Sequence, residues 1–270
     1  MSYCPEGEQV MESNRRNFLK IGGVCALGLG SLPIVKALAQ EKGPAFSSDP
    51  RRLVAKRWAM VVDMKKCWEM GKPGCKDCVL ACHTVHNVPD IKDEQEEIKW
   101  IWPEQFNHAF TGQENEFIPA EMKEKPFLML CNHCANPPCV RVCPTKATFK
   151  SPDGITMMDF HRCIGCRYCM AGCPYGARSF NWQDPRPHIQ TELNMSFPTR
   201  ERGVVEKCNF CTERLEVGLL PACVEACKVG GLIFGDVEDP NSNVRKVLAE
   251  RFTMRRKPEL GTQPNVYYIV

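Results

Sequence analysis

The apolar positions of this chain fall in short runs that turn residues interrupt. The clearest runs are Trp58–Asp63 (WAMVVD) and Gly154–Asp159 (GITMMD). Short apolar runs bounded by turn residues predict strands. The chain also contains 21 prolines and 19 glycines, which break up longer elements. The pattern therefore predicts an α+β fold of short strands and short helices.

A second pattern repeats along the chain. Three segments start at a cysteine and continue alike, namely Cys143–Ala147 (CPTKA), Cys173–Ala177 (CPYGA) and Cys227–Gly231 (CKVGG). Repetition of a short segment at corresponding places is typical of a duplicated structural unit. We expect one turn to be used several times.

Sixteen of the 18 cysteines form four groups of four, and each group ends in C-x3-C. Group one is Cys67, Cys75, Cys78 and Cys82; group two is Cys131, Cys134, Cys139 and Cys143; group three is Cys163, Cys166, Cys169 and Cys173; group four is Cys208, Cys211, Cys223 and Cys227. Group three, C-x2-C-x2-C-x3-C before a proline, has the spacing of bacterial ferredoxins that bind [4Fe–4S] clusters. The cysteines therefore predict four [4Fe–4S] clusters.

Two other uses of cysteine are less favoured. Structural zinc sites usually combine two distant pairs of ligands, whereas group three places three thiols close together on one loop. Disulfide scaffolds occur in exported proteins but seldom repeat C-x2-C and C-x3-C in this way. The chain has no C-x2-C-H motif, so covalent haem is not predicted.

The ligand sets follow from the chemistry of two-cluster ferredoxins, in which the fourth cysteine of a run binds the other cluster. Groups two and three are separated by 19 residues and predict an inner ferredoxin unit, 131–173. Groups one and four predict an outer unit, 67–82 with 208–227. The predicted sets are site 1 (Cys67, Cys75, Cys78, Cys227), site 2 (Cys208, Cys211, Cys223, Cys82), site 3 (Cys131, Cys134, Cys139, Cys173) and site 4 (Cys163, Cys166, Cys169, Cys143).

Residues 1–39 predict an export signal. Arg15 and Arg16 precede a mild apolar stretch, and Ala37–Ala39 (ALA) supplies a small-residue cleavage site. The stretch is shorter than the roughly 20 residues that a membrane span needs. We expect export by the twin-arginine route to the periplasmic face of the cytoplasmic membrane. Residues 40–56 then form a linker before a double ferredoxin-like domain, 57–270.

The formal charge of the chain is +3. A [4Fe–4S] core with four thiolates carries about −2, so four clusters would make the loaded protein acidic. No basic stripe remains for nucleic acid, and no nucleophile or further metal set predicts a catalytic residue. Five potential tuning residues flank cluster cysteines, where a cation or donor raises a cluster's potential. They are His133, Arg162, Arg167, Arg178 and Lys207.

Residues 83–130 form an insertion between groups one and two. The insertion has ten acidic against four basic residues, and its aromatic residues include Trp100, Trp102, Phe106, Phe110 and Phe117. Two interpretations stay open. The segment is either a docking surface for a partner or a solvated loop that buries its own aromatic side chains.

The part of the chain after the signal resembles the four-cluster ferredoxin-like electron-transfer subunits of membrane-associated oxidoreductases. Within that family it is similar to the DsrO-type subunits linked to sulfite reduction. The segments that carry the resemblance are 86–89, 97–102, 131–139, 163–169, 221–227 and 261–270. One departure lies in group one, where seven residues separate Cys67 from Cys75, more than the family pattern has. Cys67 is therefore the least secure of the predicted ligands.

The resemblance implies a non-catalytic subunit that relays electrons between a polytopic quinone-interacting membrane subunit and a multihaem cytochrome c, within a larger membrane complex of sulfate- or sulfite-reducing metabolism. An alternative in the same family is a subunit of a molybdenum reductase for polysulfide or tetrathionate, of a nitrite reductase or of a periplasmic hydrogenase. An alternative of another class is a binding module whose clusters are structural.

Overall fold

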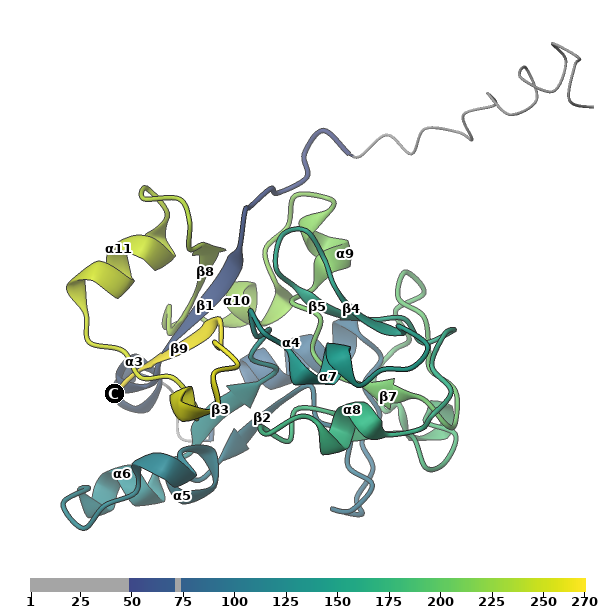
Figure 1. Ribbon diagram of the computed structural model, residues 1–270, viewed down its shortest axis with the longest axis horizontal. Helices are drawn as coiled ribbons and strands as arrows, with labels where there is room; N and C mark the ends of the chain where they lie inside the picture. Colours follow the sequence, from purple (N-terminus) through teal and green to yellow (C-terminus); the bar gives the residue numbers. More distant parts are fainter. Residues whose placement is uncertain (1–48, 71–73) are drawn as a thin grey trace, which may run out of the picture. The chain divides into compact units, whose positions relative to one another are not determined.

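The computed structural model describes residues 49–70 and 74–270, so the predicted signal and most of the linker lie outside the described residues. This part of the chain is a mixture of short strands and short helices (Figure 1). Its strands are β1 (Trp58–Asp63), β2 (Ile101–Glu104), β3 (Phe127–Leu130), β4 (Thr148–Lys150), β5 (Thr156–Met158), β6 (Ser179–Phe180), β7 (Val205–Glu206), β8 (Leu232–Asp236) and β9 (Val266–Ile269).

The α-helices are equally short. They are α3 (Met64–Met70), α4 (Asp77–Val85), α5 (Phe106–Ala109), α6 (Ala120–Glu124), α7 (Pro138–Arg141), α8 (Tyr168–Ala171), α9 (Thr212–Leu215), α10 (Ala222–Ala226) and α11 (Asn243–Glu250). Single 3-10 turns are η2 (Thr111–Gln113), η3 (Arg186–His188) and η4 (Pro258–Leu260). None of the helices between Asp49 and Val270 that the structure describes combines the length and the apolar character that crossing a bilayer requires.

The principal sheet has three strands in the order β8-β1-β9. Strand β1 pairs antiparallel with β8 and parallel with β9. Its residues alternate between two apolar layers, as strand geometry requires. Met60 and Val62 enter the main core, whereas Ala59 and Val61 pack with Val244 of α11. The predicted strand at 58–63 is confirmed, and its run of apolar residues from Trp58 to Val62 reflects cover on both faces.

The other strands form antiparallel pairs, β2 with β3, β4 with β5, and β6 with β7. The second predicted strand is β5, which is shorter than the apolar run. Gly154 belongs to the preceding turn, with a φ of 87° and a hydrogen bond from its N–H to the Ser151 carbonyl of 3.0 Å. Because only glycine enters this conformation without strain, the turn ends before the strand begins.

The insertion at 83–130 is structured. It starts inside α4 and contains β2, α5, α6 and β3. Trp100, Trp102, Phe106 and Phe110 are buried in the main core, whereas Phe117 is 84% exposed. Four of these five aromatic side chains therefore join the core of the protein, and the segment is not a separate loop.

Two pairs of helices carry much of the cysteine framework. Helix α4 packs against α10, and α7 packs against α8 (Figure 1). Helix α4 contains cysteines of two neighbouring sites, Cys78 and Cys82. Each of the other three helices contains a cysteine of one predicted site and ends one or two residues before a cysteine of the neighbouring site. The helix pairs thus decide which thiols come together.

Candidate iron–sulfur sites

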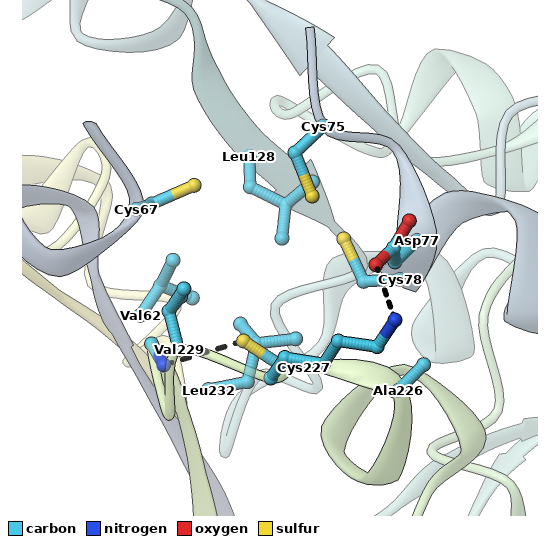
Figure 2. A pocket seen from close by; sticks show the side chains of 12 residues that line it. Val62, Cys67, Cys75, Asp77, Cys78, Leu128, Ala226, Cys227, Val229 and Leu232 are labelled. Atoms are coloured by element: carbon cyan, nitrogen blue, oxygen red, sulfur yellow. Dashed lines mark hydrogen bonds and ion pairs between the residues drawn. The ribbon is translucent and has the colours of Figure 1, made fainter. Parts of the chain in front are cut away.

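The structure brings the four cysteines of site 1 to a common space. Figure 2 shows their sulfur atoms pointing towards a common space. The four cysteines line a cavity of about 210 Å³. Cys67 lies in α3, Cys75 just before α4, Cys78 in the first turn of α4, and Cys227 directly after α10. The thiol of Cys67 lies with the other three despite the long gap that follows it in the sequence.

Site 2 is the most buried of the four sets. Cys82 on α4 meets the thiols of Cys208, Cys211 and Cys223. Burial raises the pKa of Cys82 well above its ordinary value, and the three neighbouring thiols raise it further. Burial likewise raises the pKa of Cys208 to about 12, with the thiol of Cys131 as the next cause.

Sites 3 and 4 are tighter. The site 3 cysteines line a cavity of about 20 Å³ and the site 4 cysteines one of about 10 Å³. Each cavity contains the three early cysteines of one group and the fourth cysteine of the other, Cys173 in site 3 and Cys143 in site 4. All sixteen cysteines from 67 to 227 are free thiols, so disulfides do not join them.

Helix geometry explains the C-x3-C at the end of group one, where both cysteines lie within α4. Four residues advance about 6 Å along a helix axis, so two cysteines at this spacing lie on one face but reach different cavities. On α4, Cys78 faces site 1 and Cys82 faces site 2. Sites 2 and 3 are neighbours through Cys208 and Cys131. The four sites therefore form a row in the order 1, 2, 3, 4.

Two loop conformations recur around the row. The third residue of a C-x2-C loop has a positive φ three times, at His133 (40°), Gly165 (69°) and Phe210 (55°). At Gly165 a Cβ would also collide with the carbonyl oxygen of Gly203. The third residue after a fourth cysteine also has a positive φ three times, at Lys146, Gly176 and Gly230. The reused turn that the sequence predicts is confirmed.

The donor set fits a cluster with four thiolate ligands. Four thiols converge at each site, and buried anions so close together need a bound cation to be stable. Backbone N–H groups already donate hydrogen bonds to several of the sulfurs, as they would to the thiolates of a bound cluster. Such contacts are Gly231 N to Cys227 Sγ at 3.3 Å, Ala222 N to Cys211 Sγ at 3.4 Å and Thr148 N to Cys143 Sγ at 3.5 Å.

Two residues at site 2 were not predicted from the motifs. His86 Nδ1 lies 3.7 Å from Cys82 Sγ, and His86 Nε2 lies 2.8 Å from the Glu213 carboxylate. The imidazole stacks on Trp100 with ring centroids 4.5 Å apart. The only signal for His86 in the sequence was its place in a segment that carries the family resemblance. His133, which the sequence did single out, is buried and accepts a hydrogen bond from Thr156 N at 3.2 Å.

Comparison with known proteins agrees with this geometry. Residues 124–188 and 190–237 match the family described as the 4Fe-4S dicluster domain. The chain is 41% identical to the Hdr-like menaquinol oxidoreductase iron–sulfur subunit 1 of Archaeoglobus fulgidus, over 94% of this chain and 97% of the relative.

Two further relatives are named as subunits of other reductases. The B subunit of tetrathionate reductase from Salmonella typhimurium is 34% identical over 96% of this chain and 89% of its own length. The menaquinone reductase iron–sulfur cluster-binding subunit of Nitratidesulfovibrio vulgaris is 35% identical over 79% of this chain and 88% of its own length. The chain belongs to the family of four-cluster ferredoxin-like iron–sulfur subunits typified by the B subunits of dimethyl sulfoxide reductase and of NrfC-type systems.

Proposed function

We propose that this protein is a one-electron relay with a [4Fe–4S] cluster at each of sites 1 to 4, built from two duplicated ferredoxin-like units. The observation that carries the proposal is the unbroken row of four-thiol sites, in which adjacent sites share a helix or adjoining cysteines. A cluster bound at a site supplies a centre that takes up and releases one electron. A row of such centres suits transfer from one end of the protein to the other.

The two ends of the row differ from its middle in their access to solvent. Cys75 in site 1 and Cys166 in site 4 are exposed, whereas all four cysteines of site 2 are buried. Electron exchange with a partner requires a short distance between centres, so sites 1 and 4 are the natural points of entry and exit. The residues around sites 2 and 3 keep water out and fix the position of the ligands.

The partners that we propose are a polytopic quinone-interacting membrane subunit at one end and a multihaem cytochrome c at the other. The names of two relatives include menaquinol or menaquinone, which supports a quinone-linked complex. The motif resemblance supports the DsrO-type assignment and sulfite-linked metabolism. We further propose that Arg15 and Arg16 direct export to the periplasmic face by the twin-arginine route.

A second candidate is the iron–sulfur subunit of a molybdenum reductase. The likeness to the B subunit of tetrathionate reductase, over 96% of this chain, favours it specifically. Gentle detergent extraction separates the two candidates. A multi-span protein and a cytochrome c should accompany this protein in the first case, and a molybdenum-containing subunit in the second.

The central test is anaerobic purification followed by iron analysis and electron paramagnetic resonance. Four clusters require about sixteen irons per chain and reversible reduction of every cluster. Stoichiometric zinc, or about four irons, would contradict the proposal. Clusters that resist reduction and reoxidation would instead indicate a binding module with structural clusters.

A further inference from the structure

The structure separates the four cations among the potential tuning residues, Arg162, Arg167, Arg178 and Lys207, into two kinds. Arg162 and Arg167 are exposed; the first pairs with Asp159 at 3.2 Å and the second lies over the Trp182 ring at 4.6 Å. Arg178 and Lys207, in contrast, are only 5% and 1% exposed. A charge excluded from water acts on its neighbours far more strongly than one that water screens.

Arg178 lies between sites 3 and 4. It lines the site 3 cavity, and its Nη1 donates a hydrogen bond of 3.1 Å to Thr148 Oγ1, a residue that lines the site 4 cavity. Its Nη2 is buried and has no protein partner among the described residues. Burial lowers the pKa of Arg178, but the thiols of Cys139 in site 3 and Cys169 in site 4 outweigh this effect, so that the pKa is raised.

Lys207 lies between sites 2 and 3. Its Nζ donates a hydrogen bond of 2.7 Å to the carbonyl of Cys208, a site 2 cysteine. The same Nζ donates to the carbonyl of Thr156, which lines the site 3 cavity. Two carbonyl acceptors hold an ammonium group in place, because such a group has donors and no acceptor. Lys207 thus bridges the second and third sites as Arg178 bridges the third and fourth.

Within the part of the chain that the structure describes, site 3 therefore adjoins both of these buried cations, Arg178 and Lys207. Sites 2 and 4 each adjoin one of the two cations. The cation that lines the site 1 cavity is Lys228, whose side chain is 82% exposed and lies 3.9 Å from Asp77.

Reduction of a cluster takes one electron from the preceding centre, breaks no bond, and changes the charge of the cluster and its ligands from about −2 to about −3. Adjacent positive charge stabilises the reduced form.

We propose that Arg178 and Lys207 raise the reduction potential of the cluster in site 3 above the potentials of the other three, so that the electron rests in the middle of the row. The inference rests on the proposed function, because it requires clusters in the four sites. Arg178 and Lys207 act as tuning residues through the clusters and bind no substrate.

The test replaces each cation in the cluster-loaded protein and measures the four potentials by redox titration with electron paramagnetic resonance. Lys207→Met and Arg178→Met remove the charge, whereas Lys207→Arg and Arg178→Lys retain it. Arg162→Met is the matched control for an exposed cation. Cys173→Ser identifies the site 3 signal by altering one of its ligands.

Each neutral variant should lower the reduced-to-oxidised ratio of the site 3 cluster at least tenfold at a fixed potential, which is about 59 mV for one electron. Lys207→Met should also shift site 2, and Arg178→Met should also shift site 4. The charge-retaining variants should recover more than half of the shift. Arg162→Met should change no ratio by more than about twofold, because water screens its charge.

Fully loaded neutral variants whose site 3 ratio stays within about twofold of the unaltered protein would overturn the inference. If a neutral variant loses iron, the inference is tested on the potentials of the four clusters in the unaltered protein. Its highest potential must belong to the signal that Cys173→Ser identifies, and a higher potential at another site would overturn the inference. An unaltered protein with far fewer than about sixteen irons would contradict the proposed function instead.

Discussion

The principal sheet and the inner unit at 131–173 have different kinds of core. In the sheet, every residue of β1 is buried, and Trp58 stacks on Phe234 with ring centroids 4.9 Å apart. In the inner unit, no helix exceeds four residues, and Cys139 and Cys169 are two of the three buried members of a small core, the third being Val205 of β7. Apolar burial can fold the first region. The second has thiols where a core would be, so its stability must come from what the thiols bind.

Removing the iron should expose this difference most strongly. We expect an anaerobic chelator to unfold the inner unit while the sheet stays folded. Amide protons of Thr156 and Met158 in β5 should exchange at least about 100-fold faster, since metal binding supplies their folding free energy. Amides of Met60 and Val62 in β1 should stay protected. Hydrogen-exchange mass spectrometry measures both, and equal loss of protection in the two regions would refute the contrast.

Removing one ligand should break the inner unit more selectively. Cys173→Ala should abolish the site 3 cluster and about four irons, because Cys173 lies with the thiols of Cys131, Cys134 and Cys139. The signal of the site 4 cluster should persist, although Cys173 follows the site 4 cysteines in sequence. Cys143→Ala is the matched variant and should give the opposite result. Loss of the site 4 cluster in Cys173→Ala would mean that the four cysteines of each group bind the same cluster.

The region between the insertion and β7 offers a third kind of core, a buried ion pair. Arg200 and Glu206 are fully buried and 2.7 Å apart, and Trp100 Nε1 donates to the same carboxylate at 2.8 Å. Arg200→Met leaves a buried carboxylate without its cation, which costs about 3–5 kcal/mol. The free energy of opening at β7, measured by native-state amide exchange, should fall by this amount. Glu206→Gln combined with Arg200→Met should recover part of the loss, and no recovery would contradict the electrostatic explanation.

The sequence predicts those features that depend on local spacing. Strand β1 follows from the run at 58–63, and the repeated turns follow from the segments after Cys143, Cys173 and Cys227. Contacts between distant segments cannot be predicted from local spacing. Strand β9 pairs with β1 from the far end of the chain, and β2 pairs with β3 inside an insertion whose sequence is largely polar.

The sequence also does not predict which charged residues are buried. Arg162 and Arg178 look alike in the sequence, since both lie close to cluster cysteines, yet one is exposed and the other is buried between two sites. Arg200 and Glu206 give no sign of burial either, because the side chain that covers them, Trp100, comes from the insertion. Burial of a charge depends on the whole surrounding structure, which spacing along the chain does not encode.

The smallest effect is expected at the entrance to site 1, where Lys228 faces Asp77 across 3.9 Å. The two side chains are 82% and 47% exposed, so water screens the pair. Lys228→Gln should cost less than about 1 kcal/mol, and added salt should remove even that difference. Denaturation of the loaded protein at low and high salt measures the effect, with Lys228→Arg as the control that keeps the charge. A fall of more than about 2 kcal/mol in the free energy of unfolding, or loss of iron from site 1, would contradict this expectation. Site 1 would then depend on a charge that acts as if it were buried, like the charges near sites 2 to 4.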